Sequence, residues 1–130
     1  MIVVDASVVL EVLLSTEAGA SIADRIFDGS RALHAPHLMD VEVVQVLRRY
    51  VVRGELTEDR ARQALDLLQD LPLRRHEHWP LIGRMWALRK NLTAYDAAYV
   101  ALAEALRATL VTRDRALASV PGLGALVELM

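Results

Sequence analysis

Near its N-terminus the chain has the sequence Ile2-Val3-Val4-Asp5-Ala6-Ser7, and this stretch decides the fold class. The run from Ile2 to Val4 is apolar and β-branched, which is typical of a short buried strand. It ends at Asp5, and the residues from Ala6 to Leu14 then have a helical pattern. A short apolar strand followed at once by a helix is the first unit of an alternation that continues along the chain.

The rest of the sequence repeats this alternation. We expect further helices at Thr16 to Gly29, Met39 to Arg53, Thr57 onward, Pro80 to Lys90, Thr93 onward and Arg113 to Ala118. We expect further strands at residues 31–34, 71–74, 109–112 and 125–129. The pattern predicts an α/β fold with a central, mostly parallel sheet of short strands and helices on both faces. Because no linker or repeat interrupts it, we expect one domain over residues 1–130.

Composition narrows the functional classes. The chain has 130 residues, of which 54% are apolar and 25% charged, and this balance favours a packed core over disorder. With a net charge of −2, the chain cannot hold nucleic acid by bulk charge alone. Binding of nucleic acid would need a local basic patch or a bound cation. The absence of cysteine excludes disulfides, thiolate metal sites and cysteine nucleophiles.

The N-terminal residues do not have the pattern of a signal peptide, because the first basic residue is Arg25. The longest apolar run, from Ala97 to Ala103, is too short to span a bilayer. These features predict a cytoplasmic protein with no membrane partner.

Four acidic residues stand at the starts of expected helices, namely Asp5, Glu42, Asp96 and Asp114. Each has a structural explanation beside the functional one. Asp5 and Asp114 fit helix N-caps. Glu42 fits a first-turn acid behind Asp40 as the N-cap. Asp96 fits the far end of a capping box opened by Thr93, although glutamate is the usual residue there.

Taken together, the four acids favour a metal site. Asp5 and Asp114 each follow an expected strand of one parallel sheet, so both lie at its carboxyl edge, where α/β proteins bind ligands. Carboxylates that converge there repel one another and raise one another's pKa, and a divalent cation removes that conflict. Carboxylate and water ligands suit Mg²⁺ or Mn²⁺. Such an ion polarises a phosphodiester and lowers the pKa of a bound water.

Four segments together resemble the PIN-domain family, and more narrowly its VapC toxins of type II toxin–antitoxin pairs. They are Val3-Val4-Asp5-Ala6-Ser7, Pro36 with Glu42, Thr93 to Ala103, and Leu110 to Leu117. The resemblance spans Ile2 to about Leu129. It implies an endoribonuclease that depends on Mg²⁺ or Mn²⁺. The catalytic and metal-binding residues that it implies are Asp5, Glu42, Asp96 and Asp114.

The resemblance also implies supporting residues and partners. Ser7 and Thr112 match the hydroxyls that orient carboxylates or waters. Arg113 and Arg115 flank Asp114 and are our candidates for gripping the substrate phosphate. Since a metal-activated water is the expected nucleophile, the products should carry 5′-phosphate and 3′-hydroxyl ends. The implied partners are RNA, a cognate VapB-type antitoxin and a second copy in a homodimer, with DNA contacted only through the antitoxin.

Other interpretations compete with this one. A catalytically inert PIN-like module that acts only through its protein partner remains the main alternative. A phospho-accepting receiver domain needs a strand-end lysine, and the only lysine is Lys90 on an expected helix. A dehalogenase-like phosphatase needs an aspartate where Ser7 stands. We expect the histidines to be ordinary polar residues, with His76 and His78 in a solvated turn.

Overall fold

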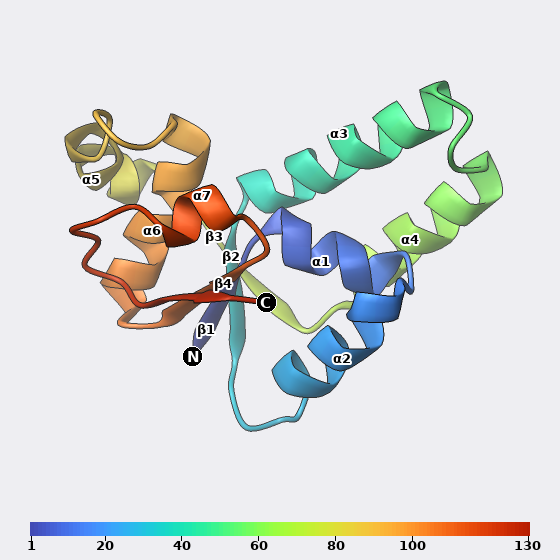
Figure 1. The fold of residues 1–130 in the computed structure, drawn as a ribbon, viewed down its shortest axis with the longest axis horizontal. Coiled ribbons are helices and arrows are strands. Elements are labelled where there is room, and N and C mark those ends of the chain that lie inside the picture. The colour runs from blue at the N-terminus through green and yellow to red at the C-terminus, as the bar shows by residue number, and fades with distance from the viewer.

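A computed structural model describes all 130 residues. Its centre is a five-stranded sheet in the order β3-β2-β1-β4-β5, drawn in Figure 1. The strands are β1 (Ile2–Val4), β2 (Leu33–Pro36), β3 (Leu73–His76), β4 (Thr109–Thr112) and β5 (Val127–Leu129). All four strand pairs are parallel, so the predicted α/β class is confirmed and the sheet is parallel throughout. The first strand lies in the middle of the sheet, and its three residues are all buried.

Helices cover both faces of the sheet. They are α1 (Ala6–Leu13), α2 (Glu17–Ile26), α3 (Leu38–Val52), α4 (Glu58–Asp70), α5 (Ile82–Ala87), α6 (Ala94–Leu106) and α7 (Arg115–Ala118), with a 3₁₀ turn at Trp79–Leu81. In Figure 1 the helices α1 to α4 lie on one side and α5 and α6 on the other. The pair α3 and α4 extends away from the sheet as a helical hairpin. This arrangement leaves the carboxyl ends of the strands facing the starts of α1, α3 and α6.

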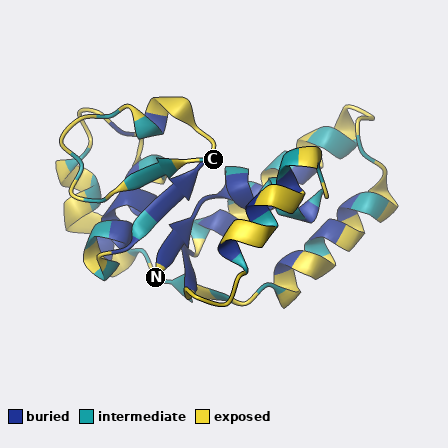
Figure 2. Cartoon of the chain, turned by 60° about the horizontal axis from the view of Figure 1, so that its bottom comes forward, coloured by how far each residue is buried: buried dark blue, intermediate teal, exposed yellow.

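The core lies between the sheet and the helices next to it. Figure 2 shows the central strands as its most buried elements, and the exposed residues gather on the outer faces of the helices. Helix α6 buries seven residues in succession, from Ala97 to Ala103. A helix that is apolar on all sides at mid-length belongs in the interior. The apolar run from Ala97 to Ala103, which is too short to span a membrane, is therefore the buried middle of α6, where this helix crosses the sheet. No single helix is long and apolar enough to cross a membrane, and α1 with α2 passes that test only as a pair bent by 114°.

Several predicted boundaries were wrong by about two residues. Strand β2 continues to Pro36, which was expected to stop it, because proline is tolerated at a strand end. Strand β3 begins only after Pro72, whose missing N–H cannot join the ladder. The helix expected from Pro80 to Lys90 is a 3₁₀ turn followed by the six residues of α5. The caps predicted at Thr16, Thr57 and Thr93 are confirmed, since each hydroxyl accepts a backbone N–H of its helix.

The prediction that Asp40 is the N-cap of α3 was wrong. The helix already begins at Leu38, and the Leu38 N–H donates to Nε2 of His78 at 2.9 Å. Asp40 instead lies in the first turn and forms a two-pronged ion pair with Arg75, with N–O distances of 2.7 and 3.0 Å. Arg75 also donates to the Leu68 carbonyl. This set of contacts ties the start of α3 to β3 and to the end of α4.

The expectation of a solvated turn at His76 and His78 was also wrong. His76 is the last residue of β3, and its Nε2 lies 2.8 Å from Nδ1 of the buried His34 on β2. Burial lowers the pKa of both rings, so both are neutral at pH 7. The histidines therefore help to join two neighbouring strands and the loop that follows them.

Candidate active site

Asp5 leaves the middle of the sheet at its carboxyl edge, because β1 is the central strand. Its carboxylate caps α1 by accepting the Val8 N–H at 3.2 Å, so the capping explanation is correct. The same carboxylate accepts the Ser7 hydroxyl at 2.5 Å and the Thr112 hydroxyl from β4. Only 7% of Asp5 is exposed. Burial raises the pKa of its carboxyl, and the hydrogen bonds oppose that rise.

The turn after β4 is connected to the start of α1 by the two predicted hydroxyls. Thr112 donates to Asp5 and accepts the Asp114 N–H at 3.0 Å. Ser7 donates to Asp5 and accepts the Arg113 N–H at 3.0 Å. Asp114 itself caps α7 through its side chain. Ser7 and Thr112 thus link the backbone on which Asp114 stands to the carboxylate of Asp5.

Glu42 reaches the same edge from the second turn of α3. Its Oε1 accepts the Tyr99 hydroxyl at 2.5 Å, and Tyr99 is a core residue of α6 that is only 2% exposed. Burial raises the pKa of Glu42, and the charges of Asp5 and Asp96 raise it further, while the Tyr99 bond opposes the rise. Burial and Glu42 raise the pKa of Tyr99, so its hydroxyl stays protonated and donates.

Tyr99 is a site residue that the sequence reasoning missed. Its position three residues after Asp96 on one helix places both side chains on the same face, and that spacing was the available signal. Tyr99 has two roles, because its ring lies in the core and its hydroxyl reaches Glu42.

Asp96 completes the set from the first turn of α6, where its N–H donates to Thr93. Burial raises the pKa of Asp96, and the charges of Asp114 and Asp5 raise it further. Each of the four acids therefore lies in the field of at least one other. The fold brings together all four predicted acids, which come from β1, α3, α6 and the turn after β4.

The chemistry of the donors fits a hard cation. The site offers carboxylate and hydroxyl oxygens, with no sulfur, and repulsion between carboxylates is what such a cation relieves. The acids do not form a finished cage, because no group of three or more potential ligands is gathered closely enough to hold a metal ion. Several oxygens are instead occupied by protein donors, such as Tyr99 on Glu42 and the α7 backbone on Asp114.

The two flanking arginines differ in their surroundings. The Arg113 side chain has Nε 3.4 Å from Oε1 of Glu11 and donates to the Met130 carbonyl. Arg115 is exposed at the start of α7. Of the two, Arg115 is the one whose side chain forms no ion pair.

The fold and the site together define an α/β protein with an acidic site at the carboxyl edge of a parallel sheet. Sequence comparison identifies the family to which it belongs. The family model described as PIN domain matches residues 2–123. The chain therefore belongs to the PIN-domain family.

Relatives narrow this assignment. The chain is 45% identical over 129 residues to "Ribonuclease VapC1" of Mycobacterium tuberculosis, which covers 98% of this chain and 96% of that protein. This similarity places the chain among the VapC proteins. Among solved structures, the fold is similar to PAE2754 from Pyrobaculum aerophilum, with a TM-score of 0.74, 25% identity and coverage of 97% of this chain and 82% of that one. It is also similar to VapBC2 from Rickettsia felis bound to a promoter DNA fragment, with a TM-score of 0.74, 13% identity and coverage of 99% and 98%.

Proposed function

We propose that this protein is an endoribonuclease that depends on Mg²⁺ or Mn²⁺ and serves as the toxin of a type II toxin–antitoxin pair. One observation carries the proposal: four acids from four distant segments meet at one sheet edge. Burial raises the pKa of Asp5, Glu42 and Asp96, and the charges of neighbouring acids raise the pKa of Glu42 and Asp96 further. Keeping such charges together is costly unless a cation or a reaction uses them. The VapC ribonuclease names of the relatives support an RNA substrate.

A divalent cation bound here would supply a water of lowered pKa and neutralise charge on the phosphate. The residues of the chain hold the acids in place for it. Ser7 and Thr112 fix the Asp5 carboxylate, and Tyr99 fixes Glu42. Because water attacks rather than the 2′-hydroxyl of the RNA, the products carry 5′-phosphate and 3′-hydroxyl ends. We also propose a cytoplasmic location, where the RNA substrate would lie.

We also propose two protein partners. An antitoxin is supported by the VapBC2 structure and by a toxin–antitoxin complex from Klebsiella pneumoniae among the structural neighbours. An arginine from it, paired with Asp5, Asp96 or Asp114, would compete with the cation, so inhibition should weaken as Mg²⁺ rises. A homodimer is supported by exposed apolar side chains on the 3₁₀ turn and α5, where Trp79 is 72% and Trp86 is 68% exposed. Light scattering at micromolar concentration should give the mass of a dimer.

The decisive experiment compares RNA cleavage by the wild type and Asp96→Asn, with Asp66→Asn on the surface of α4 as the matched control. Asp96→Asn should abolish cleavage, and Asp66→Asn should leave it unchanged. Mapping of the product ends should find 5′-phosphates. Calorimetric titration with Mg²⁺ should show that Asp96→Asn binds the ion more weakly. Wild-type protein that neither binds Mg²⁺ nor cleaves RNA would instead be the inert binding module.

A further inference from the structure

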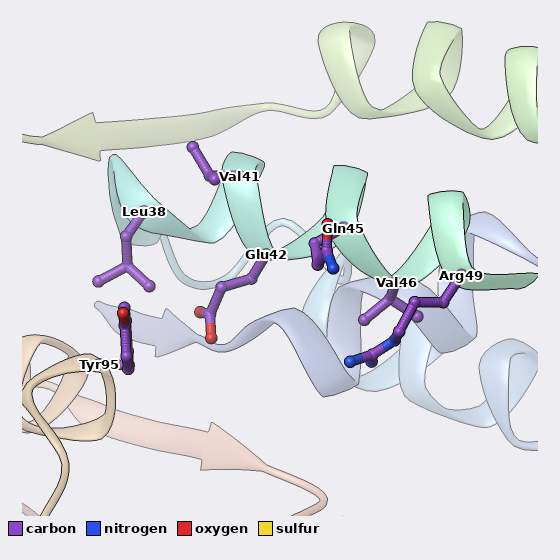
Figure 3. A pocket seen from close by; sticks show the side chains of 7 residues that line it. All are labelled: Leu38, Val41, Glu42, Gln45, Val46, Arg49 and Tyr95. Carbon is purple, nitrogen blue, oxygen red and sulfur yellow. The ribbon is translucent and has the colours of Figure 1, made fainter.

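A cavity of about 340 Å³ lies directly beside the acids, between the first turns of α3 and the start of α6. Figure 3 shows Tyr95 of α6 opposite Leu38 of α3, with Glu42 reaching toward the space between the two elements. Gln45, Val46 and Arg49 continue the wall along α3. Since Glu42 belongs both to this wall and to the acidic cluster, a ligand in the cavity lies next to whatever the acids bind.

The wall of the cavity combines a flat apolar surface with polar groups at one end. Tyr95 presents an aromatic ring that is 66% exposed, and Leu38 and Val46 add aliphatic surface. Gln45 offers an amide that both donates and accepts hydrogen bonds. A nucleobase has the same combination, with an apolar face for stacking and a polar edge for hydrogen bonds.

Arg49 supplies the charge that the backbone of a nucleic acid requires. The ion pairs of the chain use other arginines, namely Arg25, Arg75, Arg84 and Arg113. Arg49 is exposed at the end of the cavity away from Tyr95, as Figure 3 shows, and is therefore free to pair with an anion. Arg49 is a cation close to a site that is otherwise acidic. It therefore suits one phosphate of the RNA backbone when the adjacent phosphate lies at the acids.

The size of the cavity suits a small ligand such as one base. Its volume of about 340 Å³ lies at the lower end of the range of small-molecule sites.

We propose that this cavity binds one unpaired nucleobase of the RNA, next to the phosphate that a divalent cation would hold at the acids. The base stacks on Tyr95 against Leu38, Gln45 hydrogen-bonds its edge, and Arg49 pairs with the following phosphate. The proposal rests on the proposed function, because it assigns part of the substrate to a subsite beside the same acids. The subsite favours single-stranded RNA, since a paired and stacked base cannot enter it.

The experiment measures binding without cleavage. A fluorescein-labelled single-stranded RNA of mixed sequence is titrated with protein in EDTA, and anisotropy gives Kd. Tyr95→Ala should weaken binding about 5- to 150-fold, which corresponds to 1–3 kcal/mol for the loss of one stacking platform. Tyr95→Phe keeps the ring and should bind as the wild type does. Tyr95→Leu serves as a second variant if the alanine substitution impairs folding.

The charge contact has a matched control on the same helix. Arg49→Ala should weaken RNA binding. It should also reduce the slope of log Kd against log salt concentration by about 0.7, the value for one phosphate contact to a single strand. Arg48→Ala removes the same charge from the neighbouring residue, which lines a different groove between α3 and α4, and should leave Kd unchanged.

The possible outcomes separate this proposal from the proposed function. Unchanged RNA binding by Tyr95→Ala, with cleavage by the wild type in Mg²⁺, overturns the subsite alone. RNA binding that depends on Tyr95, without any cleavage, supports the subsite and overturns the proposed function. If Tyr95→Ala and Arg49→Ala weaken binding of the antitoxin but not of RNA, the cavity is a protein-binding surface and the proposal is wrong.

Discussion

Replacing Asp5 with asparagine should stabilise the metal-free protein at neutral pH while abolishing RNA cleavage. Burial raises the pKa of the Asp5 carboxyl above its ordinary value of 3.8. The folded protein therefore binds this proton more tightly than the unfolded chain does. The resulting stability is fully present below the unfolded pKa and is lost as pH rises through the folded pKa. At pH 7 the ionised carboxylate is thus a net cost, which asparagine removes.

Two opposing effects set the size of the change. The charge of Asp5 raises the pKa of both Glu42 and Asp96, and repulsion of this kind is on the order of 2 kcal/mol at an effective dielectric constant of 20. Asparagine keeps an oxygen for the bonds from Ser7 and Val8, but its amide nitrogen cannot accept the Thr112 hydroxyl. Losing that bond costs about 1 kcal/mol. A net gain of about 1 kcal/mol corresponds to a rise in Tm of roughly 3–5 °C for a chain of this size.

The assay is thermal unfolding followed by circular dichroism in EDTA at pH 7, 5.5 and 4. The stabilisation should be largest at pH 7 and should shrink toward pH 4, where the wild-type carboxyl takes up its proton. Asp28→Asn is the control: Asp28 is exposed, and its bonds from Ser30 lower the pKa of its carboxyl, so neutralising it should not raise Tm. A fall in Tm of the same size at every pH would refute the argument and make Asp5 a stabilising cap. Retained cleavage would refute its catalytic role.

Three further results are expected. Tyr99→Phe keeps the buried ring but removes the bond to Glu42, so RNA cleavage should fall about 10- to 100-fold and calorimetry should show weaker Mg²⁺ binding, while circular dichroism stays unchanged. Chelation with EDTA should stop cleavage, and Mg²⁺ at 100 times its Kd should raise the unfolding free energy by about 2.7 kcal/mol in urea titrations. Gly19→Ala should lower that free energy by about 1–3 kcal/mol, since its new Cβ would lie 2.2 Å from the Glu11 carbonyl oxygen, whereas Gly83→Ala meets no neighbour and should raise it by up to about 1 kcal/mol.

Local patterns in the sequence determined most of the secondary structure. The apolar run at Ile2 to Val4 became the central strand, and the threonine caps formed where their hydroxyls could reach a backbone N–H three residues ahead. These features depend on neighbours within one turn or one strand, so the sequence contains all the partners. The boundaries at Pro36 and Pro72 were harder to predict, because whether a proline ends or begins a strand depends on which strand lies beside it.

The sequence also predicted which acids converge at the carboxyl edge of the sheet, because strand ends and helix starts can be recognised locally. It did not determine how those acids are held. Thr112 lies 107 residues from Asp5, Tyr99 lies 57 from Glu42, and Arg75 lies 35 from Asp40. Those contacts follow from the strand order β3-β2-β1-β4-β5, which places β1 beside β4 and brings α6 toward α3. Local propensity carries no information about that order, because it is set by how the apolar faces of the helices pack across the whole sheet.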